Sequence, residues 1–92
     1  MIRFTPLSTA GIPQIVKFME DFYAIDDYTF DADITRENFA NFLKNPSLGN
    51  IFLIRDKEDI IGYIIIVYFF SFEFQGKVAL LDELYLTTSA RG

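Results

Sequence analysis

The chain has 92 residues, of which 51% are hydrophobic and 17% aromatic, and thirteen acidic against eight basic residues give a net charge of −5. This length allows a single domain, residues 1–92, and this composition excludes intrinsic disorder. Because the sequence has no Cys and no His, it excludes thiol nucleophiles, disulfides, imidazole catalysis and most transition-metal sites, so we expect no metal. It also has no basic stretch, so we expect no nucleic-acid partner.

The first part of the chain predicts a short strand and a helix. Residues 2–5 alternate apolar and polar side chains, which is typical of a strand. Ser8 or Thr9 can cap a helix that tolerates Pro13 in its first turn and ends near Ile25. Its apolar side chains recur at helical spacing and are Ile12, Ile15, Val16, Met19, Phe22 and Tyr23.

A loop and a second helix follow. Residues 26–33 break the helical periodicity and predict a loop. Thr35 can cap the second helix, and Asn45-Pro46 ends it. Its expected buried side chains are Phe39, Phe42 and Leu43.

The second half of the chain predicts three strands. They are expected at residues 50–55, 60–70 and 78–86, with turns rich in charged residues or Gly between them. The element order is therefore β-α-α-β-β-β. We predict an α+β fold with a mostly antiparallel sheet and two helices packed against it.

The apolar run at residues 60–72 could be mistaken for a membrane segment. As a helix its thirteen residues would span about 20 Å, short of the roughly 30 Å hydrocarbon core. Its β-branched and aromatic residues favour a strand buried on both faces, and core packing explains the Phe and Tyr excess at residues 63–74 better than a lipid or aromatic-ligand groove. The N-terminus is not a signal peptide. We therefore expect a cytoplasmic protein without a membrane partner.

This element order and four stretches of sequence resemble the first half of the GNAT superfamily of acyl-CoA-dependent N-acetyltransferases. MIRFTPLST resembles the opening strand of that family, and FMEDFYAIDDY resembles its first helix and substrate loop. DKEDIIGYIII resembles a hairpin in which Gly follows the turn, and LLDELYLTTSARG resembles the strand that leads into the cofactor loop. The resemblance implies transfer of an acetyl group from acetyl-CoA to the primary amine of a small molecule.

The end of the chain matches only the beginning of the family's cofactor loop. That loop has the pattern Arg/Gln-x-x-Gly-x-Gly/Ala at the start of a helix, where glycines and unpaired N–H groups bind a pyrophosphate. Arg91 and Gly92 match a frequent opening of it, so the resemblance implies that they contact acetyl-CoA. It also implies that backbone groups of Leu84, Tyr85 and Leu86 pair with the pantetheine arm. Because the later glycines do not follow, we expect a truncated domain that is inactive alone.

Acetyl transfer requires a base that deprotonates the amine. Without His or Cys, a carboxylate acting directly or through water is the obvious choice, and Glu83 is the candidate because the family often places an acid on this strand. Asp82 is the reserve candidate. Simple alternation puts Glu83 on one face with Ala79 and Leu81, and Asp82 on the other, but a bulge, common in this strand of the family, would swap the faces beyond it. A solvated strand carboxylate without a catalytic role is the alternative.

The segment at residues 20–37 holds seven acidic residues and one basic residue. Between two helices over the sheet, these acids would attract cationic amines, and the interleaved aromatic rings could hold an alkylammonium. We therefore expect a cationic, even polycationic, amine to bind over Tyr23, Asp26, Asp27, Tyr28 and Phe30. A polar loop with helix-capping acids is the alternative.

Two other classes of function remain open from the sequence. One is a small binding or regulatory module that holds a cationic ligand or partner on the acidic, aromatic loop. The other is an interaction module without catalysis whose aromatic sheet forms a homodimer. A truncated domain would also expose apolar sheet surface and an unpaired strand edge, so we expect a homo-oligomer.

Overall fold

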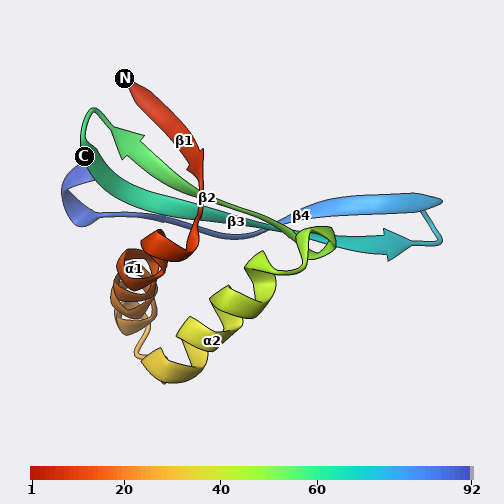
Figure 1. The fold of residues 1–92 in the computed structure, drawn as a ribbon, viewed down its shortest axis with the longest axis horizontal. Helices are drawn as coiled ribbons and strands as arrows, with labels where there is room; N and C mark the ends of the chain where they lie inside the picture. The colour runs from red at the N-terminus through yellow and green to blue at the C-terminus, as the bar shows by residue number, and fades with distance from the viewer. Residues whose placement is uncertain (92) are drawn as a thin grey trace.

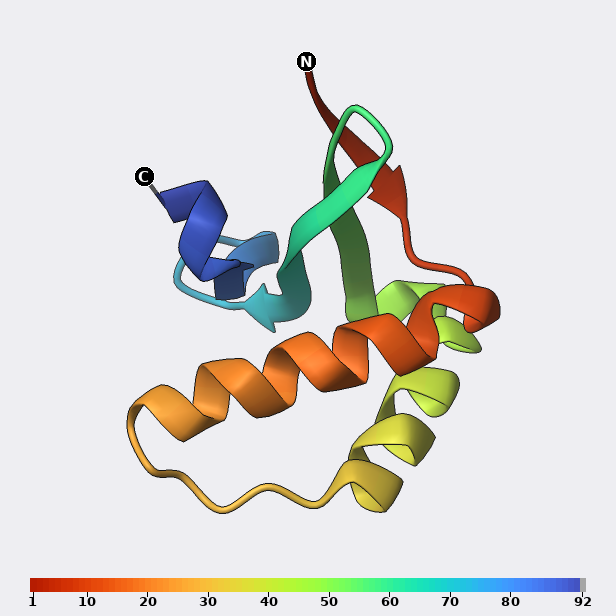
Figure 2. The same ribbon diagram turned by 90° about the vertical axis from the view of Figure 1, so that its left-hand side faces the viewer.

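The computed structural model describes residues 1–91 and confirms the predicted α+β architecture. Two helices cover one face of a four-stranded antiparallel sheet, whose strands lie in the order β1-β2-β3-β4 (Figure 1). In chain order the elements are β1 (Ile2–Pro6), α1 (Ile12–Ile25), α2 (Ala32–Leu43), β2 (Gly49–Asp56), β3 (Asp59–Ser71) and β4 (Gly76–Leu86). The view along the sheet shows that both helices lie on the same side of it (Figure 2).

Helix α1 follows the predicted periodicity but starts later than expected. Four of the six predicted apolar residues are buried, and the other two, Phe22 and Tyr23, are partly buried. A short 3-10 turn at Thr9–Gly11 precedes the helix, and Gly11 is its N-cap without a side-chain hydrogen bond. The predicted cap at Ser8 or Thr9 is therefore wrong, because Ser8 precedes the 3-10 turn and Thr9 belongs to it, so neither residue adjoins the α-helix.

Helix α2 is capped by Asp31 rather than by Thr35. The Asp31 carboxylate accepts a hydrogen bond of 3.0 Å from the backbone N–H of Ile34, and the helix begins at Ala32. The Thr35 hydroxyl donates a bond of 2.7 Å back to the carbonyl oxygen of Asp31. The predicted cap is therefore wrong by about one helical turn, and the predicted loop end at residue 33 lies two residues too late.

The core lies between the two helices and the sheet. The strands contribute Ile51, Leu53, Tyr63, Ile65 and Tyr85 to it, and helix α1 contributes most of the remaining buried side chains. Tyr63 and Ile15 are completely buried. Helix α2 is attached more loosely, because Phe39 is its one buried residue. This difference leaves open space between α2 and the sheet.

The far ends of β3 and β4 project beyond the rest of the sheet (Figure 1). The pairing of β2 with β3 ends where Gly49 lies opposite Val67, while β3 and β4 remain paired as far as Ser71 and Gly76. We call this two-stranded ribbon, residues 68–79 with its turn, the hairpin arm. The side chains of Phe70, Phe72 and Phe74 are 65%, 89% and 71% exposed. The prediction that residues 60–72 form a strand buried on both faces is therefore wrong for the second half of that run, and core packing does not account for the exposed Phe side chains there.

No helix within residues 1–91 is long and apolar enough to cross a membrane.

Candidate active site

The carboxylate of Glu83 is held by two tyrosines under the helices. The hydroxyl of Tyr63 donates a hydrogen bond of 2.8 Å to Oε1, and the hydroxyl of Tyr23 donates one of 2.7 Å to Oε2. Tyr63 lies on β3 beside Glu83, whereas Tyr23 reaches it from α1. An ionised carboxylate can accept about four hydrogen bonds. Glu83 is therefore fixed in position but can still accept a proton or bind a cation.

A β-bulge in β4 brings Asp82 to the same cavities as Glu83. Ile65 lies opposite Glu83 and Ile66 lies opposite Leu81, so Asp82 has no residue opposite it. Both carboxylate residues line the space under the helices. The β-bulge expected in this strand is confirmed. Because of it, Glu83 and Leu81 lie on opposite faces of the sheet, and Leu81 shares its face with Ile66.

The bulge also corrects the position of Ala79. Simple alternation placed Ala79 on the same face as Glu83, but Ala79 lies opposite Tyr68, two residues along β3 from Ile66. Ala79 therefore shares the face turned away from the helices. Leu80, which lies opposite Val67, takes its place on the face of Glu83.

Both tyrosines that bind Glu83 are kept in their neutral, donating form. Burial and the hydrogen bond to Glu83 raise the pKa of Tyr23 to about 12, with a further contribution from the charge of Asp82. The same two causes raise the pKa of the more deeply buried Tyr63 further. The ring of Tyr63 stacks on Tyr85 at 5.8 Å between centroids, and Phe22 packs against both rings. This aromatic packing holds Tyr63, and through it the carboxylate of Glu83, in position.

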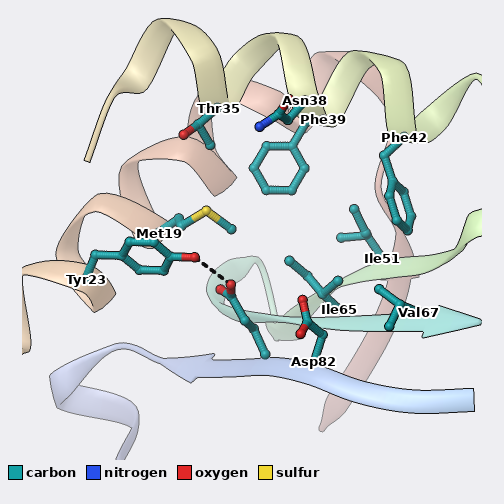
Figure 3. A pocket seen from close by; sticks show the side chains of 11 residues that line it. Met19, Tyr23, Thr35, Asn38, Phe39, Phe42, Ile51, Ile65, Val67 and Asp82 are labelled. Atoms are coloured by element: carbon teal, nitrogen blue, oxygen red, sulfur yellow. Dashed lines mark hydrogen bonds between the residues drawn. The ribbon is translucent and has the colours of Figure 1, made fainter. Parts of the chain in front are cut away.

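Two cavities meet at Tyr23 and the two carboxylates. The inner cavity, about 420 Å³, lies between α1, α2 and the sheet (Figure 3). Its lining side chains come from both helices and all three longer strands and are Met19, Tyr23, Thr35, Asn38, Phe39, Phe42, Ile51, Ile65, Val67, Asp82 and Glu83. The outer cavity, about 410 Å³, is lined by Phe22, Tyr23, Asp26, Tyr28, Asp82 and Glu83.

The structure brings together part of the predicted substrate site. Tyr23, Asp26 and Tyr28 line the outer cavity with Glu83, as a site for an amine near a base requires. Phe30 packs edge-on against the ring of Tyr23 at 5.6 Å and lines neither cavity. Asp27 is exposed in a left-handed turn with φ of 59° and also lines neither cavity. These two residues shape the loop and lie outside the cavities.

The residues expected to contact acetyl-CoA lie at the end of β4 and just beyond it. Tyr85 is 6% exposed and belongs to the core, whereas Leu84 is 49% exposed on the face away from the helices, and Leu86 is partly buried there. Strand β4 is an edge strand within the described part of the chain. The Nε of Arg91 donates a bond of 2.8 Å to the carbonyl oxygen of Leu86. Gly92 lies outside the described residues.

The sequence reasoning missed Tyr63 and the α2 wall of the inner cavity. Tyr63 is a hydroxyl-bearing side chain inside the apolar run IIGYIII, and a buried Tyr hydroxyl usually has a hydrogen-bond partner. From that rule, an acid on the neighbouring strand could have been predicted as the partner of the Tyr63 hydroxyl. The cavity itself depends on how α2 packs, for which the sequence carries no signal. Residues 1–91 contain no group of three or more His, Cys, Asp or Glu side chains arranged to hold a metal ion.

Comparison with solved structures identifies the fold. An integron cassette protein from the mobile metagenome of Cole Harbour Salt Marsh matches with a TM-score of 0.91 and 28% identity over 97% of this chain. A protein described as a possible acetyltransferase from Clostridium difficile 630 matches with a TM-score of 0.86 and 15% identity over 99% of the chain. A predicted acetyltransferase from Clostridium acetobutylicum, crystallised with acetyl-CoA, matches with a TM-score of 0.81 and 15% identity over the whole chain. This chain has the fold of the N-terminal part of a GNAT acetyltransferase.

The GNAT-like part is shorter than these neighbours. The chain spans 59%, 60% and 64% of the length of the three proteins, respectively. No protein-family model matches the chain, and no curated protein matches it. The predicted GNAT fold is thus confirmed by structure, at a level of sequence identity that leaves the reaction to be argued from the site.

Proposed function

We propose that the chain supplies the base and the amine site of an N-acetyltransferase that uses acetyl-CoA. The observation that carries the proposal is the carboxylate of Glu83, fixed by Tyr63 and Tyr23 where two cavities meet. A fixed carboxylate beside an open cavity is suited to bind an ammonium group and then accept its proton. The crystallisation of one structural neighbour with acetyl-CoA supports the choice of acyl donor.

The reaction requires three transfers. Glu83 accepts a proton from the ammonium, directly or through water, and the freed amine nitrogen attacks the thioester carbonyl carbon. The new C–N bond forms and the C–S bond breaks, so that the thiolate leaves with the bonding electron pair. The nitrogen then passes its second proton, directly or through water, to the thiolate, so the products are a neutral acetamide and coenzyme A, and Glu83 releases the first proton to water. Asp82 adds negative charge that attracts the cationic substrate.

The end of β4 fits an extended acyl donor. Because the outer edge of β4 has no strand neighbour within residues 1–91, backbone groups of Leu84, Tyr85 and Leu86 on that edge can pair with the pantetheine arm. We assign Arg91 and Gly92 to the pyrophosphate by the resemblance of their sequence. The chain spans 60% and 64% of the length of the two neighbours described as a possible and a predicted acetyltransferase, and we expect residues 1–92 to be inactive by themselves.

The test is an assay of acetyl transfer by the protein at its natural length, in which the free thiol of the released coenzyme A is measured. We expect Glu83→Gln to lower kcat by about 100-fold or more, since a positioned general base typically contributes that much. Glu73→Gln is the matched control, because Glu73 is exposed in the turn of the hairpin arm, and it should retain full activity. Activity of Glu83→Gln within about twofold of the wild type would remove Glu83 from the reaction.

A further inference from the structure

The inner cavity carries charge at only one end. Asp82 and Glu83 supply its two carboxylates, both from the bulge of β4. Most of the other lining side chains are apolar and are Met19, Phe39, Phe42, Ile51, Ile65 and Val67. The remaining polar contributions besides Tyr23 are the neutral side chains of Thr35 and Asn38 on α2. A ligand that fits this cavity has one cationic end and an apolar body.

The acidic loop at residues 20–37 adds no carboxylate to the inner cavity. Asp31 caps α2, Asp33 pairs with Arg36 in the next turn, and Asp21 pairs with Lys17 at 3.1 Å. Of the seven acids at residues 20–37, only Asp26 lines either of the two cavities. Local helix contacts thus explain much of the acidic composition that had suggested a polycationic substrate.

The free-energy cost of burying a charge favours a monoamine over a diamine as the ligand of the inner cavity. A primary ammonium beside Glu83 keeps a carboxylate partner when water is displaced. A second ammonium at the far end would lie among apolar walls without a carboxylate, and burying an unpaired charge is strongly unfavourable. An apolar body in the same place gains free energy because its surface leaves water.

We propose that the inner cavity binds a primary monoamine with an apolar aryl or alkyl body, whose ammonium group lies at Glu83 and Asp82. This inference rests on the proposed function, since it names the amine that the same base would deprotonate. A volume of about 420 Å³ lies within the range of roughly 300–1,000 Å³ typical of small-molecule sites. The outer cavity, with Asp26 and Tyr28, is the approach to this site.

The test is direct binding to the 92-residue chain, measured by calorimetry without acetyl-CoA. The probes are 2-phenylethylamine, its uncharged analogue 2-phenylethanol, and 1,5-diaminopentane, a dication with a flexible alkyl body. We expect 2-phenylethylamine to bind at least about tenfold more tightly than either of the others, which lack the charge or the apolar end.

Two variants fill the inner cavity from opposite walls. Val67→Phe enlarges a half-buried side chain of β3, and Asn38→Phe enlarges an exposed side chain of α2, so at least one should fold normally. Each folded variant should weaken 2-phenylethylamine binding by about tenfold or more. Asn41→Phe, which enlarges an exposed side chain of α2 that lines neither cavity, is the matched control and should change this affinity by less than about twofold.

The outcomes separate this inference from the proposed function. Equal or tighter binding of 1,5-diaminopentane, or unchanged affinity in both folded cavity-filling variants, would overturn the monoamine assignment. If 2-phenylethylamine binds as expected but the natural-length protein does not acetylate it, the cavity assignment stands and the transferase proposal fails. If the natural-length protein acetylates diamines in preference to monoamines, the transferase proposal stands and this inference fails.

Discussion

Glu83 is partly buried and yet carries a carboxylate, a group that normally stays in contact with water in a folded protein. A partly buried carboxylate destabilises the fold unless hydrogen-bond donors compensate for the lost water. Tyr63 and Tyr23 provide these donors, one to each oxygen, and they come from a strand and from a helix that the fold brings together. Because both donors are neutral, the carboxylate keeps its negative charge available for a cation. Tyr63 and Tyr23 are therefore positioning residues for the candidate base.

The pKa of Tyr23 makes the stability of the fold depend on alkaline pH. Folding raises this pKa from 10.0 to about 12, so the folded state favours the neutral phenol. The stabilisation is fully present below pH 10 and is lost as the pH rises toward 12, because the unfolded chain then releases the proton more readily. Urea unfolding measured from pH 8 to 11 should show a decreasing free energy of unfolding.

The variant Tyr23→Phe isolates this contribution. It cannot release a phenolic proton, so its free energy of unfolding should fall less steeply above pH 10 than that of the wild type. Tyr63 is unchanged in this variant and still contributes, because its pKa is also raised. Tyr28→Phe, at an exposed position, should keep the wild-type slope. Identical slopes for Tyr23→Phe and the wild type would contradict the link between Tyr23 and Glu83.

The pairing of β3 with β4 sets the geometry of the site, and Gly62 permits it. A Cβ atom at Gly62 would overlap the carbonyl oxygen of Tyr85, and backbone cannot move aside as a flexible side chain can. Gly62→Ala should therefore separate the strands next to Tyr63 and lower the free energy of unfolding by about 1–3 kcal/mol or more. Gly76→Ala is the matched control, because no atom lies within 4 Å of its added Cβ. Denaturant unfolding of the two variants measures the difference, and equal stabilities would show that the β3–β4 pairing is not this close.

At the scale of elements, periodicity was a good guide and boundaries were not. The spacing of Ile12, Ile15 and Val16 follows from the one face that α1 can bury, so it could be read from the sequence. The N-cap of α2 could not be read from the sequence in the same way. Asp31 and Thr35 are both good N-cap residues, and the choice between them depends on where the chain reverses its direction. The aromatic residues of the hairpin arm favour a strand, but strand propensity does not predict whether other elements bury that strand.

The candidate site was predictable to a similar degree. Glu83 could be selected because the sequence lacks better bases, and its resemblance to an acid on a GNAT strand added support. The position of Asp82 depends on a bulge, which is a property of the pairing between two strands rather than of either strand alone. The inner cavity arises from the loose packing of α2 over β3, a tertiary feature that local patterns do not encode.

Residues 1–91 form a less compact structure than is expected for a domain of this length. Its radius of gyration is 14.0 Å, against about 12 Å expected for a compact domain of this size. The hairpin arm accounts for the elongation, since it projects past β2 and the helices (Figure 1). A two-stranded ribbon is marginally stable in water, and exposed apolar patches usually mark contact surfaces. The arm therefore favours a partner, and a second copy of the chain is the simplest one.

We expect residues 1–92 to self-associate through the hairpin arm at micromolar concentrations. The double variant Phe70→Ser/Phe72→Ser removes two large exposed rings, which pack against each other at 5.2 Å between centroids, and should shift the sedimentation coefficient toward that of a monomer. Ile34→Ser removes another exposed apolar side chain, from α2, and should leave association unchanged. If the wild type sediments as a monomer, the arm is not a self-association surface. If it associates and the double variant does so equally well, the contact lies elsewhere, for example at the exposed face that carries Leu81 and Leu84.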